Sequence, residues 1–257
     1  MQTHEFFENK HAETLLKKNG LGDFESLWDL QAQWVEEPNV RRGGWSGVVR
    51  HTLQNAEGED IEVFIKRQEG HISKTLAHPC KGILTLKKEY ANIQCLKSLA
   101  IPTLTPLYFG YSGNKAVLAT FGLCDHTSLD HIHPAELTRA QRRKLLSRIA
   151  GIVKNMHTHR LQHNCLFPKH IFVKWDADDW DVRIIDLEKT KRTFLQRSAT
   201  HRDLSTLYRH ADSRWSKSDR VFFFRQYREE QSLTPGSKKI WRKIAAQSKH
   251  KRQRIQH

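Results

Sequence analysis

The spacing of apolar residues changes along the chain, from alternation in the first half to a helical period in the second. Residues 61–68, IEVFIKRQ, alternate as in a half-buried strand, and RRGGWSGVVRHTLQ predicts a partner strand on the other side of the turn-like NAEGED. IPTLTPLYFGYSGNKAVLATFGL predicts two further strands with a turn at 112–114. The N-terminal half is therefore expected to be mainly β.

Helical spacing predicts the remaining elements. DFESLWDLQAQW at 23–34 and ILTLKKEYANIQCLKSL at 83–99 predict helices within the β-rich half. At 137–159 the apolar positions fall on one helical face, at Leu145, Ile149, Ile152, Val153 and Met156. A strand pair, HIFVKW and DVRIIDLE, is followed by two more helices, around RDLSTLYRH and RVFFFRQYREE.

Strands followed by helices predict an α+β protein of two lobes joined near residues 121–127. We expect an N-terminal helical extension at 1–35 and a mainly β N-lobe with one helix at 36–122. A helical C-lobe at 123–232 and a basic C-terminal tail at 233–257 complete the predicted organisation.

The net charge of +15 and the pI near 9.8 favour anionic partners: nucleic acid, phosphorylated lipid or sugar, or a membrane surface. Eight of the positive charges lie between Gln231 and His257, where there is no acidic residue, so a solvated tail is expected. Within it, KKIWRKIAAQ predicts a short amphipathic helix that could contact a membrane peripherally. Nucleic acid is disfavoured because no recognition motif accompanies the charge.

The cysteines, Cys80, Cys95, Cys124 and Cys165, are isolated, with neither C-x-x-C nor zinc-type spacing, which is typical of structural thiols in a reducing compartment. The sequence MQTHEFFENK lacks the basic and apolar regions of a secretory signal. No apolar run approaches the ~18 residues of a membrane-spanning helix.

Three features of the β-rich half are typical of a nucleotide site. Gly44 and Gly47 match the later part of G-x-G-x-x-G-x-V, with Arg42 in the place of the first glycine, and such glycines let backbone amides approach phosphate oxygens. Lys66 ends the run VFIK, and Glu89 follows 23 residues later in a predicted helix, where a partner carboxylate would lie. Taken singly, a hairpin turn, an exposed lysine and a solvated glutamate explain them equally well.

The second half adds a histidine-containing loop and a carboxylate at a strand end. LQHNCLFPKHIFV has the form of H-R-D-x-x-x-x-N before a strand, with His163 and Cys165 as catalytic candidates. Asp186 follows the apolar VRII strand, where a carboxylate suits Mg²⁺, and His170 is the second metal-ligand candidate. The order and spacing of all these features predict a protein-kinase-like fold.

Three segments, WVEEPNVRRGGWSGV, QHNCLFPKHIFVKW and IIDLEKTKR, resemble the InaA branch of the lipopolysaccharide kinase family, which includes Kdo kinase and WaaP-type heptose kinases. The resemblance runs from about residue 34 to 210. It implies a cytoplasmic kinase-like protein that uses ATP with Mg²⁺ or Mn²⁺ and phosphorylates an inner-core sugar of lipopolysaccharide or another anionic acceptor. It also implies that Asp203 braces the catalytic loop.

The loop departs from the kinase pattern at three positions: Asn164 replaces the arginine, Cys165 the catalytic aspartate and His170 the metal-binding asparagine. A thiol with a reference pKa of ~8.5 is mostly protonated at neutral pH and is a poor base. Histidine suits metals softer than Mg²⁺. Three hypotheses stay open: a phosphotransferase, a nucleotide-binding pseudokinase that regulates envelope enzymes or an acid-stress response, and an electrostatic membrane or nucleic-acid binder. The third is compatible with either of the others.

Overall fold

The computed structural model describes residues 2–41, 43–75 and 78–253. Arg42, Arg254 and the end of the basic tail therefore lie outside the described residues. The chain forms two compact units, one comprising Met1–Gln94 and Leu104–Cys124 and the other Cys95–Thr103 and Asp125–His257. Each unit is described by itself below.

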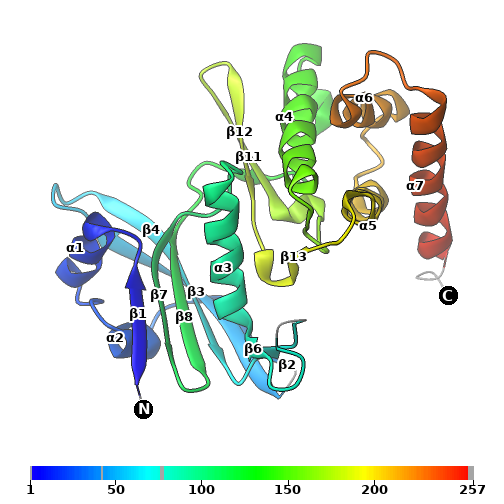
Figure 1. Ribbon diagram of the computed structural model, residues 1–257. Coiled ribbons are helices and arrows are strands. Elements are labelled where there is room, and N and C mark those ends of the chain that lie inside the picture. Colours follow the sequence, from blue (N-terminus) through cyan, green and yellow to red (C-terminus); the bar gives the residue numbers. More distant parts are fainter. Residues whose placement is uncertain (1, 42, 76–77, 254–257) are drawn as a thin grey trace. The chain divides into compact units, whose positions relative to one another are not determined.

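Unit 1 contains a six-stranded antiparallel sheet, a two-stranded sheet of β5 and β6, and three helices (Figure 1). Its elements are β1 (Thr3–Phe7), α1 (Lys10–Lys18), α2 (Phe24–Asp29), β2 (Trp34–Arg41), β3 (Gly44–Gln54), β4 (Asp60–Glu69), β5 (Ile72–Ser73), β6 (Ile83–Leu84), α3 (Thr85–Ser98), β7 (Pro106–Ser112) and β8 (Lys115–Phe121). The strand order is β1-β7-β8-β4-β3-β2. The last residues of α3 belong to the second unit.

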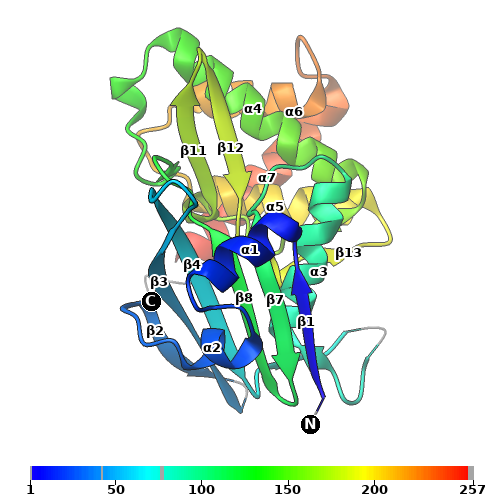
Figure 2. The same cartoon turned by 90° about the vertical axis from the view of Figure 1, so that its left-hand side faces the viewer.

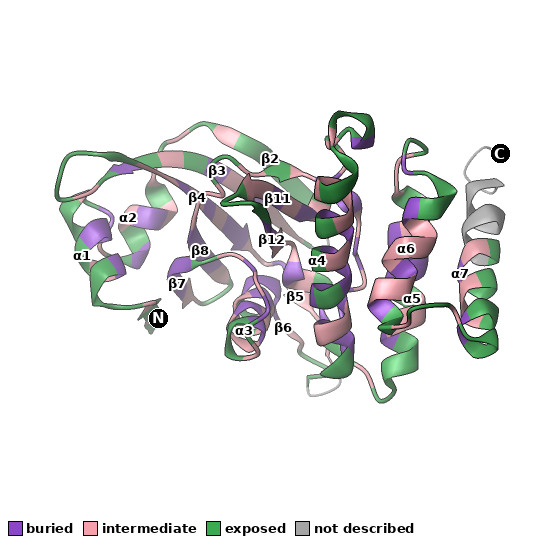
Figure 3. Ribbon diagram, turned by 90° about the horizontal axis from the view of Figure 1, so that it is seen from above, coloured by how far each residue is buried: buried purple, intermediate pink, exposed green. Residues whose placement is uncertain are grey.

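Helices cover both faces of this sheet. Figure 2 shows α1 and α2 in front of the strands, and Figure 1 shows α3 on the opposite face. Apolar residues of α1 and α2 form one core cluster with Val63 and Ile65 of β4. Figure 3 shows buried residues along the strands and on the sides of α1 and α2 that face them. Because successive strand residues point to opposite faces, Lys66 must lie on the α3 side.

The start of β3 is closely packed, and Gly43 precedes it. Gly43 has φ +79°, a left-handed conformation that favours glycine. A Cβ on Gly44 would lie 2.1 Å from the Glu69 carbonyl oxygen, and one on Gly47 would lie 2.6 Å from the Trp34 ring. These glycines therefore allow close packing of β3 on β4 and on an indole ring.

Unit 2 combines helices with short sheets. Its elements are β9 (Thr127–Ser128), a 3-10 turn (Pro134–Glu136), α4 (Arg139–Thr158), β10 (Leu161–Gln162), a 3-10 turn (Pro168–His170), β11 (Ile171–Asp176), β12 (Asp179–Ile184), a 3-10 turn (Leu187–Lys189), β13 (Lys191–Arg192), α5 (Gln196–His210), α6 (Lys217–Arg228) and α7 (Pro235–Gln253). β11 pairs with β12 and β9, and β10 pairs with β13. Within the described ranges, no helix is long and apolar enough to cross a bilayer.

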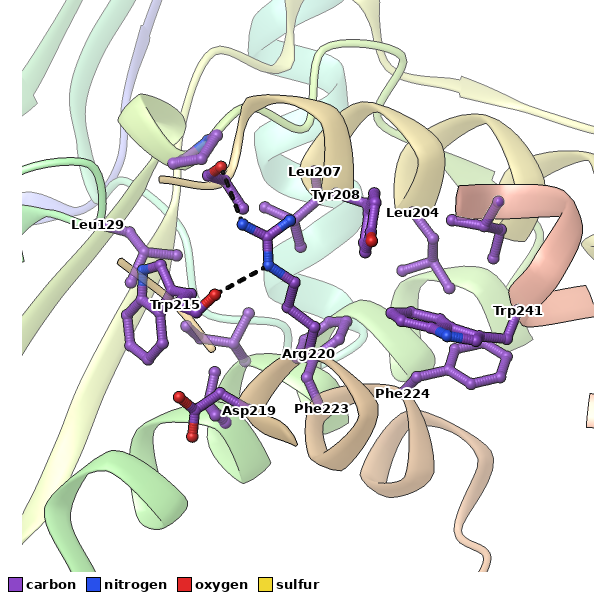
Figure 4. A pocket seen from close by; sticks show the side chains of 15 residues that line it. Leu129, Leu204, Leu207, Tyr208, Trp215, Asp219, Arg220, Phe223, Phe224 and Trp241 are labelled. Carbon is purple, nitrogen blue, oxygen red and sulfur yellow. Dashed lines mark hydrogen bonds between the residues drawn. The ribbon is translucent and has the colours of Figure 1, made fainter. Parts of the chain in front are cut away.

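In place of the expected solvated tail, residues 235–253 form α7, whose first half packs against α5 and α6 of unit 2. The rings of Trp241 and Tyr208 lie 5.1 Å apart edge to face, and Trp241 lies 5.2 Å from Phe224. Ile244 is only 1% exposed. With residues of α4, α5 and α6 these side chains line an apolar pocket (Figure 4). The predicted amphipathic helix is present, and its main apolar residues face this pocket.

The structure confirms most of the predicted elements and corrects one boundary. The helix predicted over 23–34 ends at Asp29, because Leu30 takes an extended conformation, and Trp34 begins β2. The N-terminal segment also contains β1, which pairs with β7 across about a hundred residues and which alternation does not reveal. The predicted strands at 41–54, 61–68 and 101–123 and the helices at 83–99 and 137–159 are present.

Replacing Gly44 with alanine should lower the free energy of unfolding by about 1–3 kcal/mol, because the added methyl group meets backbone atoms rather than a movable side chain. The matched control is Gly151→Ala in α4, where the new Cβ meets no atom within 4 Å and should stabilise by about 0.5–1 kcal/mol. Urea unfolding of both variants measures the difference. Equal stability of the two variants would contradict this packing.

Candidate functional site

Lys66 and Glu89 form a partly buried ion pair in unit 1. The Lys66 Nζ lies 2.7 Å from Glu89 Oε2, and the two side chains are 20% and 4% exposed. Sheet alternation directs Lys66 toward α3, and the helical period brings Glu89 to the inner side of that helix. The pairing predicted from the spacing is therefore present, and it holds an ammonium group with some solvent access on this face of the sheet.

In unit 2, the carboxylate of Asp203 holds the loop that contains Cys165. Asp203 lies on α5, is fully buried and accepts hydrogen bonds from the backbone N–H groups of His163 at 2.7 Å and Asn164 at 2.9 Å. Its Oδ2 also lies 3.2 Å from Nε2 of the buried His157. The bracing role implied for Asp203 by the family resemblance is thus seen in its contacts.

His163 is fully buried, and both of its ring nitrogens contact the backbone. Nδ1 accepts a hydrogen bond from the Cys165 N–H at 3.2 Å, and Nε2 donates to the Ile185 carbonyl at 2.9 Å. Burial lowers the pKa of His163 below its ordinary value, more than the negative charge of Asp203 raises it. The ring is therefore neutral and connects the loop to the end of β12.

Cys165 occupies the position of the catalytic aspartate as a mainly buried thiol, 9% exposed. Burial raises its pKa above the usual range, and the positive charge of Lys189 offsets only part of that effect. The thiol is therefore protonated at neutral pH and cannot serve as an effective base. Its carbonyl accepts a hydrogen bond from His170 Nδ1 at 2.8 Å.

His170 and Asp186 lie side by side at the end of this loop. His170 Nε2 is 3.4 Å from Asp186 Oδ2, and the side chains are 12% and 27% exposed. Nδ1–H donates to the Cys165 carbonyl, which directs Nε2 toward the carboxylate, and metal-ligating histidines likewise donate their other ring N–H. No group of three metal-ligating side chains occurs among residues 2–41, 43–75 and 78–253. This pair could hold a metal ion together with ligand oxygens.

The backbone fixes the position of Asp186. Ile185 donates its N–H to the His170 carbonyl at 3.0 Å and accepts from His163 through its own carbonyl. Asp186 then takes a left-handed conformation, φ 60° and ψ 60°, which aspartate tolerates better than most residues. The strand end predicted for Asp186 is thus correct to within two residues, since β12 ends at Ile184.

The predicted residues fall into two groups, one in each unit. Gly44, Gly47, Lys66 and Glu89 belong to unit 1, whereas His163, Cys165, His170 and Asp186 belong to unit 2. Sequence reasoning missed His157 and Lys189. A single histidine on an apolar helix face gives no signal of its own, but a lysine three residues after the strand-end aspartate could have been noticed.

Replacing Asp203 with asparagine should lower the free energy of unfolding by roughly 1.5–3 kcal/mol, because the carboxylate accepts charge-assisted bonds from two amides and asparagine cannot accept them all. The control is Asp125→Asn, whose carboxylate is 76% exposed and pairs only with Lys174. Urea denaturation compares the two. An Asp203→Asn variant as stable as the control would show that the brace is dispensable.

Sequence comparisons relate the chain to known proteins. The model of the lipopolysaccharide kinase (Kdo/WaaP) family matches residues 25–227. Protein InaA of Escherichia coli K12 is 27% identical over 199 residues, which cover 74% of this chain and 88% of that protein. The lipopolysaccharide core heptose(I) kinase WaaP of Pseudomonas aeruginosa PAO1 is 25% identical over 228 residues, covering 81% of each.

Two solved structures establish the fold as protein-kinase-like and bilobal. WaaP in complex with acyl carrier protein superimposes with a TM-score of 0.70 at 19% identity, covering 99% of this chain and 100% of that one. An aminoglycoside-3'-phosphotransferase of type VIII gives a TM-score of 0.54 at 16% identity, covering 92% and 99%. Because the family model spans most of the sequence, the protein belongs to the lipopolysaccharide kinase (Kdo/WaaP) family.

Proposed function

We propose that the protein is an ATP-dependent phosphotransferase that acts on an inner-core sugar of lipopolysaccharide or a related envelope acceptor. The observation that carries the proposal is the partly buried ion pair between Lys66 and Glu89. In protein kinases such a lysine contacts the nucleotide phosphates while the helix glutamate holds it in place. A kinase-family chain that keeps this pair keeps the main cation for nucleotide binding.

The remaining site residues take supporting roles in this proposal. Gly44 and Gly47 allow the close packing of β3 next to the nucleotide, and His163 positions the loop that contains Cys165. Asp186 and His170 would hold the divalent ion, which neutralises charge on the phosphates. An imidazole ligand favours Mn²⁺ over Mg²⁺ relative to an all-oxygen site.

The acceptor is inferred from the family and the charge. The WaaP relative is named as a heptose kinase, and this chain carries a net charge of +15. Exposed cations of α7, Lys238, Lys239 and Arg242, add a positive surface suited to a phosphorylated acceptor at the cytoplasmic face of the inner membrane. Nucleic acid is not part of the proposal.

A second candidate function, a nucleotide-binding regulatory pseudokinase, is favoured by the protonated thiol of Cys165. Positioning and charge neutralisation contribute most to phosphoryl transfer, whereas general-base assistance is typically worth ~10²–10⁴-fold. Loss of the base therefore slows transfer without weakening nucleotide binding. The two candidates differ in whether bound ATP is used.

ATP with Mg²⁺ or Mn²⁺ should raise the thermal midpoint of the wild-type protein, since ligand at a hundred times its Kd stabilises by about 2.7 kcal/mol. Lys66→Met should abolish this shift, and the exposed Lys81→Met control should keep it. Differential scanning fluorimetry gives the shift, and radiolabelled ATP with lipopolysaccharide core gives the transfer. Transfer no higher than that of an Asp186→Ala variant would exclude the enzyme and leave the pseudokinase.

Restoring the carboxylate by Cys165→Asp should raise the transfer rate by about tenfold or more, because an aspartate at this position can accept the acceptor proton. Cys165→Ser is the matched control, since it keeps the size of the side chain but adds no base. Single-turnover rates with saturating ATP separate the chemical step from binding. A Cys165→Asp rate below that of the wild type would mean that the thiol serves a chemistry of its own.

A further inference from the structure

The loop at 193–195 exposes two large apolar side chains. Phe194 is 86% exposed and Leu195 58%, and they are the one adjacent pair of exposed large hydrophobic residues in the described part of the chain. The other such residues are Phe6, Val35 and Val40. Exposed apolar side chains in a fixed position are typical of contact surfaces.

The loop is held firmly at its base. Before it, β13 pairs with β10, with Leu161 opposite Arg192. Thr193 donates both its N–H, at 2.8 Å, and its hydroxyl, at 3.2 Å, to the Arg160 carbonyl. After it, α5 begins at Gln196 (Figure 1). Phe194 and Leu195 are therefore presented to solvent by backbone bonds.

The flanking residues are cationic. From Lys189 to Arg202 the sequence carries five positive charges and no acidic residue. Lys191, Arg192 and Arg197 are exposed, and within the described ranges none of the three forms an ion pair with an acidic side chain. Arg192 also donates a hydrogen bond to Cys95 Sγ at 4.0 Å. An apolar pair flanked by cations that have no carboxylate partner among the described residues matches a surface that is anionic outside and apolar beneath.

The apolar residues of α7 cannot supply this contact. Trp241 and Ile244 line the apolar pocket of unit 2 (Figure 4), and the exposed residues of α7 include Lys238, Lys239 and Arg242. The loop at 193–195 offers both components that a lipid contact needs: cations for the headgroups and apolar side chains for the boundary beneath them.

We propose that Phe194 and Leu195, with Lys191, Arg192 and Arg197, form a contact site for the surface of an anionic lipid bilayer. The partner is a bilayer because a soluble acidic protein would satisfy the cations without needing an apolar insertion. The site lies next to the candidate loop, since β10 leads directly into His163. Only the purpose of this lipid contact rests on the proposed function: the contact would bring the loop that contains Cys165 to an acceptor carried in a membrane.

Co-sedimentation with phosphatidylcholine vesicles that contain phosphatidylglycerol, without nucleotide, tests the site. The wild-type protein should bind these vesicles and not vesicles of phosphatidylcholine alone. Phe194→Ser with Leu195→Ser should lower the partition coefficient roughly tenfold or more, because two apolar side chains no longer leave water. Both positions are exposed, so the far-UV circular dichroism and the thermal midpoint should stay unchanged.

Two further variants separate the alternatives. Val35→Ser with Val40→Ser removes exposed apolar residues of unit 1 and should leave binding unchanged. Lys191→Glu with Arg192→Glu should weaken binding about tenfold or more and reduce its salt dependence.

Two results would overturn the proposal: wild-type protein that does not bind anionic vesicles, and a Phe194→Ser, Leu195→Ser variant that binds them as well as the wild type does. Binding of the wild-type protein to an acidic protein, but not to anionic vesicles, would also overturn it. Vesicle binding without any phosphate transfer would instead support the lipid contact site and exclude the proposed phosphotransferase activity.

Discussion

The organisation of the candidate site depends on one buried carboxylate. Asp203 accepts hydrogen bonds from two successive backbone N–H groups, an arrangement made possible by the left-handed conformation of Asn164, φ 67°. With the loop fixed, His163 reaches the Ile185 carbonyl, and the next residue is Asp186. A continuous series of hydrogen bonds thus runs from α5 to the candidate metal ligand. The series requires neither a base at position 165 nor a bound nucleotide.

The groups that fix the conformation of this loop therefore differ from the group that would take part in proton transfer. The groups that maintain its shape are neutral or internally compensated: His163 is neutral, and Asp203 is surrounded by donors. At position 165, where the resemblance to kinases predicts a proton acceptor, the chain has a mainly buried thiol, whose raised pKa makes it a poor base. The fold consequently tolerates the loss of the base. Family membership accounts for the conformation of the loop, and it does not determine the rate of phosphate transfer.

Sequence patterns predicted the parts of the molecule that rest on local periodicity. Alternation in β4 and the helical period of α3 predicted the two elements, and the kinase-like spacing of Lys66 and Glu89 predicted their pairing. Patterns failed where the partner is distant: β1 is a strand because β7 lies beside it, and its own residues resemble a polar N-terminal segment. His157 was missed for the same reason. Its importance comes from contacts with Asp203 and Tyr227 on two other helices.

Two neighbouring cations of β4 show how strand register determines which partner each side chain contacts. Lys66 faces α3 and pairs with Glu89, whereas Arg67 faces the opposite side, donates to the Trp28 and Leu30 carbonyls and stacks 4.7 Å from the Trp34 ring. A shift of one residue would exchange the two faces. Glu89 would then lose its ammonium partner, and the planar guanidinium would leave the indole. The tryptophan packing on one face of the sheet therefore also secures the ion pair on the other.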